Sequence, residues 1–381
     1  MATTKMQRLT KKYFLSRFIL VVGSILLTMI LLEIGLRLFH PQLLIWDYRQ
    51  IWEPVAGVGW HKQPDLDIII HTAEGDVRLL TDADGYRIGE LPQDKSDIHI
   101  LAVGDSFLEA PQVTYEASMT ALLSENLAHD FSLPVTIVNA GVSGWDPNHY
   151  RVQVMQALEQ SDYDLVLVFI FLQNDLITES IDYFPPTTIL SPPFWQANHS
   201  LALNLLAIKA QLIAKLRQHS HLYRFGEESH NLILARMGEN SDYLPNELLL
   251  SEANHPKWQV TTDVLVDIAQ MANTEDTAVL FIALPPFYYM DDDNLAGMVR
   301  ALNLEGDAVD WQQPSRILSQ KFTEAGLDFV DVTPTMRAAY AVGNTELYGR
   351  IDRHFSPAGH QVVADFLTPI IWEKLKASTT E

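Results

Sequence analysis

A run of apolar and small residues begins at Phe18 and continues to Phe39, interrupted by Glu33 and Arg37. As a helix, residues 18–39 would cross a hydrocarbon core of ~30 Å at ~1.5 Å per residue. Glu33 and Arg37 are four residues apart, so they can pair on one face of that helix. The pattern therefore predicts a transmembrane helix over residues 18–39.

The flank that precedes this helix predicts its orientation. Residues 1–17 contain five Lys or Arg and no Asp or Glu, which is typical of a cytoplasmic tail. The chain after about residue 40 is then periplasmic or extracellular. A cleaved signal peptide is the alternative, but the apolar run is longer than a usual signal core and no small-x-small cleavage site follows it. We expect an uncleaved signal anchor that makes one pass through the cell membrane.

The next segment, residues 40–96, is rich in aromatic residues and turn signals. Short apolar runs at 67–71 and 77–80 predict two short strands. We interpret residues 40–96 as a juxtamembrane segment with some β structure.

From residue 97 to 375, short apolar runs alternate with helical patterns. Runs of this kind suit strands that are buried on both faces, and the alternation predicts a mostly parallel sheet between two helical layers, a three-layer α/β/α, flavodoxin-like domain. The predicted strands are 98–103, 135–138, 165–171, 278–284 and 329–332, and the predicted helices are 115–127, 150–158, 262–271, 315–325 and 357–375. Residues 376–381 are expected to be a tail.

More than a hundred residues separate the strands predicted at 165–171 and 278–284, which is too many for one crossover. Residues 183–256 therefore look like an insertion with a helical stretch at 201–216. Such an insertion could form a lid over an active site or be a structural excursion, and both interpretations stay open.

Composition narrows the classes of function. The chain has 381 residues, 48% of them hydrophobic, with 26 basic and 48 acidic residues and a net charge of −22. Nucleic-acid binding is not expected, because phosphate contacts need clustered Lys and Arg. Cysteine is absent, which excludes disulfides, a thiol nucleophile and Cys-ligated metals. No Walker A loop, dinucleotide fingerprint or convincing metal-ligand spacing is present, so no cofactor or metal is predicted.

Four segments carry candidate chemistry. The strand predicted at 98–103 is followed directly by Gly104, Asp105 and Ser106. This places a serine at the carboxyl end of a strand, where doubly wound sheets hold their reaction centres. A serine nucleophile needs a base, a group that orients the base, and an oxyanion hole. These are offered by Asp352 and His354 just before the last helix, by the glycine-containing segment from Asn139 to Gly144, and by the amide of Asn174.

In this combination and order, the segments resemble the blocks of the SGNH or GDSL hydrolases, a family of esterases, lipases, deacetylases and related acyltransferases. The resemblance covers about residues 97–374. It implies Ser106 as nucleophile, His354 as base and Asp352 as its partner, with backbone N–H of Ser106 and Gly144 and the Asn174 side chain as oxyanion donors. Asp105, Asn139 and Asp175 are interpreted as structural supports. The stretch from Thr81 to Arg87 is also similar to one in bacterial membrane-anchored members.

One departure bears on the reaction. Many family esterases have Asp-x-x-His, whereas Asp352-x-His354 is similar to the branch that includes polysaccharide O-acetyltransferases. We expect a membrane-anchored serine esterase that acts on acyl groups of a carbohydrate or lipid. An O-acyltransferase for an exported or cell-envelope polysaccharide is the alternative, and a catalytically silent carbohydrate-binding or assembly module is the third hypothesis. Protein partners cannot be inferred.

Overall fold

The computed structural model describes residues 2–44, 50–90, 96–176, 209, 212–237 and 244–378. The chain divides into two compact units. One comprises residues 1–45 and 194–231, and the other comprises residues 46–193 and 232–381. Much of the insertion expected at about 183–256 lies outside the described residues, as does residue 379 onward of the expected tail.

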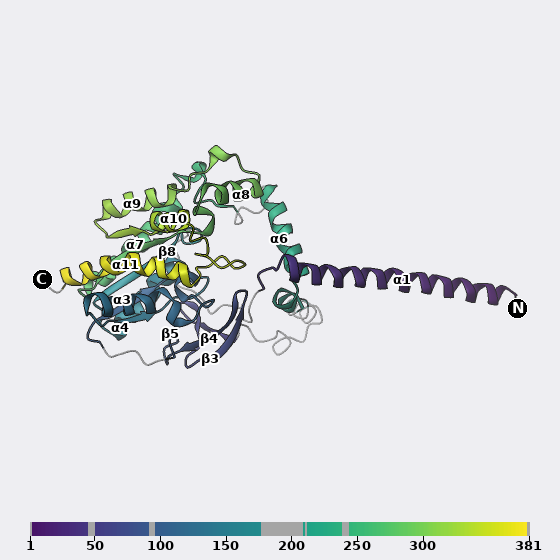
Figure 1. The fold of residues 1–381 in the computed structure, drawn as a ribbon, viewed down its shortest axis with the longest axis horizontal. Helices are drawn as coiled ribbons and strands as arrows, with labels where there is room; N and C mark the ends of the chain where they lie inside the picture. The colour runs from purple at the N-terminus through teal and green to yellow at the C-terminus, as the bar shows by residue number, and fades with distance from the viewer. Residues whose placement is uncertain are drawn as a thin grey trace. The chain divides into compact units, whose positions relative to one another are not determined.

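The first unit contains a long N-terminal helix, α1 (Ala2–Phe39), drawn in purple in Figure 1. Its segment Ser16–Phe39 has a mean hydropathy of 2.5, and no residue in the most apolar part of this segment is buried. The segment is therefore long and apolar enough to cross a membrane. Glu33 and Arg37 form the expected ion pair at 2.8 Å. The Glu33 carboxylate also accepts hydrogen bonds from the backbone N of His221 and Leu222, at the start of α6 (His221–Arg236).

The second unit is built on a sheet that, among the described residues, has eight strands in the order β10-β9-β8-β6-β7-β5-β4-β3. The first five of these are parallel. Each of the five lies within two residues of a strand predicted from the apolar runs. Their bounds are β6 His99–Val103, β7 Thr136–Asn139, β8 Leu165–Phe171, β9 Ala278–Leu284 and β10 Phe329–Asp331. All seven residues of β8 are buried, as a central strand covered on both faces requires.

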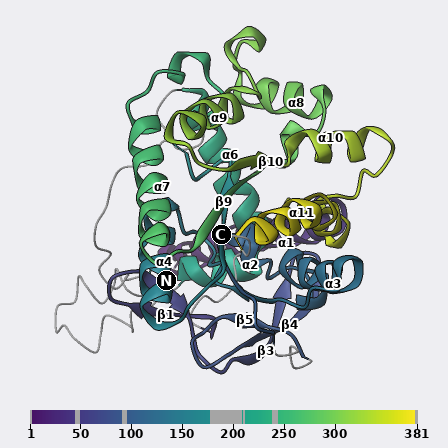
Figure 2. The ribbon, with the colours of Figure 1, turned by 90° about the vertical axis from the view of Figure 1, so that its left-hand side faces the viewer.

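Helices cover both faces of this sheet (Figure 2). On one face α3 (Met119–Phe131) packs against α11 (Pro357–Ser378), and on the other α4 (Pro147–Gln160) packs against α7 (Lys257–Thr274), which also contacts α9 (Gln313–Ala325). The predicted fold class, a three-layer α/β/α domain preceded by one apolar helix, is confirmed. Two further helices, α8 (Asp292–Leu302) and α10 (Thr333–Ala341), were not predicted.

Residues 50–90 belong to the second unit. A hairpin of β1 (Trp52–Val55) and β2 (Gly59–Lys62) forms a small separate sheet. Strands β3 (Asp67–Thr72), β4 (Gly75–Thr81) and β5 (Arg87–Ile88) are antiparallel and extend the main sheet beyond β7. The two short strands predicted here are present, but their union with the parallel sheet was not predicted.

Candidate active site

Ser106 begins a one-turn helix, α2 (Ser106–Glu109), directly after β6. The Asp105 side chain accepts a hydrogen bond of 2.9 Å from the backbone N of Phe107, which makes Asp105 the N-cap, as interpreted from the sequence. The turn is crowded: a Cβ on Gly104 would lie 3.0 Å from the Cβ of Leu108. The first N–H of a helix has no intrahelical acceptor, so the backbone N–H of Ser106 is available to a ligand.

His354 lies beside Ser106, with 2.8 Å between Nε2 and Oγ. Its backbone N donates a 3.0 Å hydrogen bond to Oδ1 of Asp352, whose other carboxylate oxygen lies 3.9 Å from Nδ1 of the same imidazole. Asp352 therefore orients His354 through the backbone, and its second oxygen faces the ring, where it can stabilise a protonated imidazole. Arg353 between them has a positive φ of 62°, the left-handed turn that allows two residues this close in sequence to face each other.

Contacts from elsewhere in the second unit hold the loop that carries His354. The carbonyl of His354 accepts a 2.7 Å bond from Gly349 N. Glu74, in the turn between β3 and β4, accepts a 2.7 Å bond from Ile351 N. The imidazole packs against the ring of Phe107, 4.8 Å between centroids. His354 is thus positioned by the strand extension as well as by its own loop.

The segment from Asn139 to Gly144 follows β7 and lies against α2. Asn139 supports it, as interpreted, by accepting a bond from Gly141 N and donating one to the Leu108 carbonyl. A Cβ on Gly141 would lie 2.5 Å from the backbone N of Glu109, so only glycine fits this contact. This loop and α2 therefore meet backbone to backbone.

One backbone N–H group in this loop has no acceptor among the described residues. Residues 140, 141, 142, 143 and 145 all donate hydrogen bonds, to Ala102 O, Asn139 Oδ1, Gly104 O, Glu109 Oε2 and Val142 O respectively. Gly144, exposed and with a φ of 80°, donates none among the described residues. Its N–H is the loop's free donor, which is what a role in an oxyanion hole requires.

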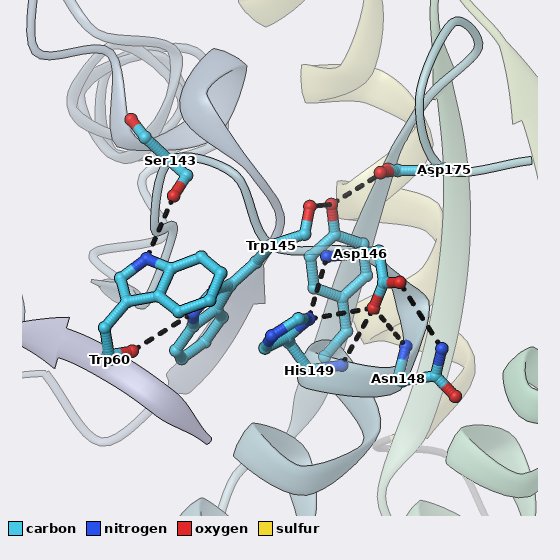
Figure 3. Close-up of polar contacts among 8 residues, drawn as sticks. Trp60, Ser143, Trp145, Asp146, Asn148, His149 and Asp175 are labelled. Carbon is cyan, nitrogen blue, oxygen red and sulfur yellow. Dashed lines mark hydrogen bonds and ion pairs between the residues drawn. The ribbon is translucent and has the colours of Figure 1, made fainter. Parts of the chain in front are cut away.

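Side chains of the β1–β2 hairpin hold this loop in place. Lys62, only 1% exposed, donates from Nζ to the carbonyl of Gly141 at 2.5 Å. The indole of Trp60 donates to the carbonyl of Ser143 at 3.1 Å, and Trp145 donates back to the carbonyl of Trp60, also at 3.1 Å (Figure 3). Burial lowers the pKa of Lys62 to about 8, and the charge of nearby Glu109 opposes that shift.

Arg87 stabilises the other end of α2. This buried guanidinium donates to the carbonyls of Glu109 and Ala110, and to that of Val113 at 2.5 Å. No further helical turn supplies donors to the carbonyls of Glu109 and Val113, because α2 ends at Glu109 and Ala110 takes a left-handed conformation with φ of 51°. The carbonyl of Ala110 also accepts a 3.2 Å bond from the backbone N of Val113. The buried cation thus replaces the backbone donors that a longer helix would supply.

Asn174 and Asp175 follow β8. Asp175, labelled in Figure 3 and interpreted as a support, accepts bonds of 2.8 Å. Their donors are the backbone N of Phe171 and the hydroxyl of Tyr150. Asn174 is exposed, and its amide donates to Oδ2 of Asp105 at 3.2 Å. Burial raises the pKa of Asp105 to about 6. Asn174 therefore contacts the residue that directly precedes Ser106.

Burial also shifts the pKa of His354, the candidate base. It lowers the pKa of His354 below its usual value of 6.5, while the charge of Asp352 opposes the shift. For the same reason burial raises the pKa of Asp352, against the charge of His354. A lowered imidazole pKa keeps the ring neutral at physiological pH, the state in which Nε2 can accept a proton.

The structure brings the five predicted site residues to one edge of the sheet. His354 contacts both Ser106 and Asp352. Asn174 bonds to Asp105, the neighbour of Ser106, and Gly144 presents a free N–H from the loop packed on α2. The sequence missed the supporting residues Trp60, Lys62, Glu74 and Glu109. Only Arg87 lay in a stretch with a signal, the similarity of residues 81–87 to membrane-anchored proteins. Among the described residues, no group of three or more His, Asp or Glu is placed to hold a metal ion.

No family model and no curated protein matches the chain. Similar solved structures include the acetyl xylan esterase AlAXEase, at 12% identity and a TM-score of 0.41 over 72% of this chain and 100% of that chain. A lipolytic G-D-S-L family member from Veillonella parvula has 11% identity and a TM-score of 0.37 over 72% and 98%. A catalytic mutant of an acetylxylan esterase from Geobacillus stearothermophilus has 16% identity and a TM-score of 0.38 over 72% and 95%.

The second of these structures belongs to the G-D-S-L family, which is the family that the four sequence blocks resemble. At these identities and TM-scores, the similarities do not by themselves assign an activity or a substrate to this chain.

Proposed function

We propose that this protein is a membrane-anchored serine ester hydrolase of the SGNH type, acting on ester-linked acyl groups of a carbohydrate or lipid. The observation that carries the proposal is the 2.8 Å approach of Ser106 Oγ to His354 Nε2. Around that pair, the free N–H groups of Ser106 and Gly144 and the nearby Asn174 amide offer the donors that an ester oxyanion needs.

In the proposed reaction the Ser106 hydroxyl donates its proton to Nε2 of His354 as Oγ attacks the acyl carbonyl. The oxyanion accepts hydrogen bonds from Ser106 N, Gly144 N and the Asn174 amide. Asp352 stabilises the imidazolium, which then protonates the departing alcohol. Water, deprotonated by His354, then attacks the acyl-enzyme. His354 returns that proton to Oγ as the bond between Oγ and the acyl carbon breaks, which releases the acid and restores the Ser106 hydroxyl.

The N-terminal helix supports the proposed location. We propose that residues 1–17 are a cytoplasmic tail, that residues 18–39 remain as an uncleaved anchor in the cell membrane, and that the domain at about 97–375 is periplasmic or extracellular. The supporting observations are the basic residues before the span and the length and hydropathy of Ser16–Phe39. A reporter enzyme that is active only outside the cytoplasm should be active when it is fused after residue 45 and also when it is fused after residue 378.

The test of the activity uses the full-length chain in detergent micelles with 4-nitrophenyl acetate as substrate. Wild type should turn over, and Ser106→Ala should lose that turnover. Ser161→Ala, at an exposed serine after α4, is the matched control and should retain it. A fluorophosphonate probe should label Ser106, identified by mass spectrometry of the peptide. Turnover that persists in Ser106→Ala would refute the proposed nucleophile.

O-acyl transfer is the second candidate, and the Asp352-x-His354 spacing favours it. Transfer would share the acyl-enzyme and differ only in the second step, where a sugar hydroxyl rather than water attacks. An acyl-enzyme that forms with 4-nitrophenyl acetate but decays faster in the presence of a sugar acceptor, with an acylated sugar as product, would favour transfer. Labelling of Ser106 in either case argues against the catalytically silent module.

A further inference from the structure

A cavity of about 1000 Å³ adjoins the candidate active site. One wall is formed at the carboxyl ends of two neighbouring strands, by Gln173 and Asn174 after β8 and Tyr288 after β9. Ligands of open parallel sheets bind at such strand ends. Asn174 belongs to both places, because its amide also contacts Asp105 beside Ser106. A molecule in this cavity would therefore reach the reacting centre through Asn174.

Glu247 is the buried polar group of this cavity. It lines the cavity, yet only 3% of the residue is exposed, and one carboxyl oxygen accepts a 2.9 Å hydrogen bond from the hydroxyl of Tyr288. The amide of Gln313 donates to the carbonyls of Glu247 and Leu249, at 3.0 and 2.9 Å, and so holds the loop. The carboxyl is thus fixed before any ligand arrives, as a residue that selects a ligand should be.

The chemistry of the lining distinguishes a hydroxylated ligand from a hydrocarbon chain. Eight of its fifteen residues are polar or charged: Gln173, Asn174, Asn246, Glu247, Glu252, His255, Lys257 and Tyr288. An alkyl chain would displace water from these groups without hydrogen-bonding to them, whereas the hydroxyls of a sugar can both donate and accept. Burial raises the pKa of Glu247 to about 8, so at neutral pH its carboxyl can donate as well as accept.

We propose that this cavity, the Glu247 pocket, is the subsite for the carbohydrate part of the ester substrate, with Glu247 and Tyr288 as its specificity-determining residues. This inference rests on the proposed function and narrows its substrate class from carbohydrate or lipid to carbohydrate. The acyl group would lie at Ser106, and the sugar would extend along Asn174 towards Tyr288.

The test compares two acetyl esters on full-length protein in micelles: an O-acetylated oligosaccharide and 4-nitrophenyl acetate, which has no sugar to place in the pocket. For Glu247→Leu and Tyr288→Phe, the ratio of kcat/KM for the sugar ester to that for the phenyl ester should fall, about tenfold or more for Glu247→Leu. Glu159→Leu, at an exposed position near the end of α4, is the matched control and should keep the wild-type ratio.

A ratio that stays constant in Glu247→Leu would overturn the proposal. A preference of the wild type for 4-nitrophenyl octanoate, together with a higher kcat/KM for that ester in Glu247→Leu, would also overturn it. Binding of the deacetylated oligosaccharide to Ser106→Ala, measured by calorimetry, separates this inference from the proposed function. Saturable binding that Glu247→Leu abolishes would support the pocket even if no ester were hydrolysed. Hydrolysis of both esters without oligosaccharide binding would refute the pocket and leave the esterase standing.

Discussion

The carboxylate of Glu109 accepts two hydrogen bonds of 2.5 Å from Ser143, one from its backbone N and one from its hydroxyl. Glu109 ends the helix that Ser106 begins, and Ser143 precedes Gly144 in the loop after β7. One side chain therefore ties the candidate nucleophile to the candidate oxyanion donor, and the spacing between these two groups depends on it.

Glu109→Ala should lower kcat by about tenfold to a hundredfold while changing KM little, because the misplaced Gly144 N–H would act on the transition state. Steady-state kinetics with 4-nitrophenyl acetate would measure this. Ser143→Ala keeps the backbone bond and should lose less. Equal losses in the two variants would show that the hydroxyl bond, and not the loop's position, matters.

Lys62→Met should reduce kcat about tenfold or more with a smaller effect on stability. Methionine leaves the Gly141 carbonyl without its donor, at about 1–3 kcal/mol, but also removes the cost of burying a cation, so the two contributions partly offset. Kinetics and the Tm of the same preparation test both halves. A large fall in Tm with kcat intact would make Lys62 a purely structural residue.

Arg87→Met should destabilise the second unit by about 3 kcal/mol, because the buried carbonyls of Glu109 and Val113 lose their donor, while that of Ala110 keeps its bond from Val113 N. Thermal unfolding in detergent would show a lower Tm. Arg350→Met, at an exposed arginine, is the matched control and should unfold as wild type does. An unchanged Tm in Arg87→Met would mean that α2 does not need this cation.

Esterase activity should rise with pH as His354 loses its proton and then stay level through neutral pH. Because burial lowers the pKa of His354, the midpoint in kcat/KM should lie below 6.5. The sign for stability is the same: the unfolded chain binds this proton more readily, so His354 costs stability as the pH falls below 6.5. A profile of kcat/KM between about pH 4 and 8 would measure this midpoint, and a midpoint above 7 would contradict the assignment of His354 as the base.

Asp352→Asn should lower kcat by about a hundredfold or more, because the imidazolium loses its ion-pair partner. Asparagine retains an oxygen that can accept from His354 N, so the loop should keep its position. The midpoint of the pH profile should move to lower pH, since Asp352 now raises the pKa of His354. Asp307→Asn, at an exposed aspartate, should alter neither quantity. A midpoint that does not move would exclude Asp352 as the electrostatic partner.

The central strands could be predicted because each is covered on both faces and must be continuously apolar. Strand β8 is the clearest case, with seven buried residues in a run that stands out in the sequence. Ser106 and Asn174 could be located for a related reason: each follows such a run, and the carboxyl ends of parallel strands meet at one edge of a sheet. Helix α8 was not predicted because it is short and begins with a cluster of aspartates.

By itself, the sequence determined the apolar N-terminal helix, the parallel α/β core and the polar residues that end its strands, because burial imposes a local pattern along the chain. Only the tertiary structure decided that β3–β5 join the main sheet and that Lys62, Arg87 and Glu109 lie behind the site. Strand pairing and buried polar contacts join residues that are distant along the chain, such as Lys62 and Gly141. No local periodicity reports such pairs, because a buried cation is stabilised by the partner it finds and not by its neighbours in sequence.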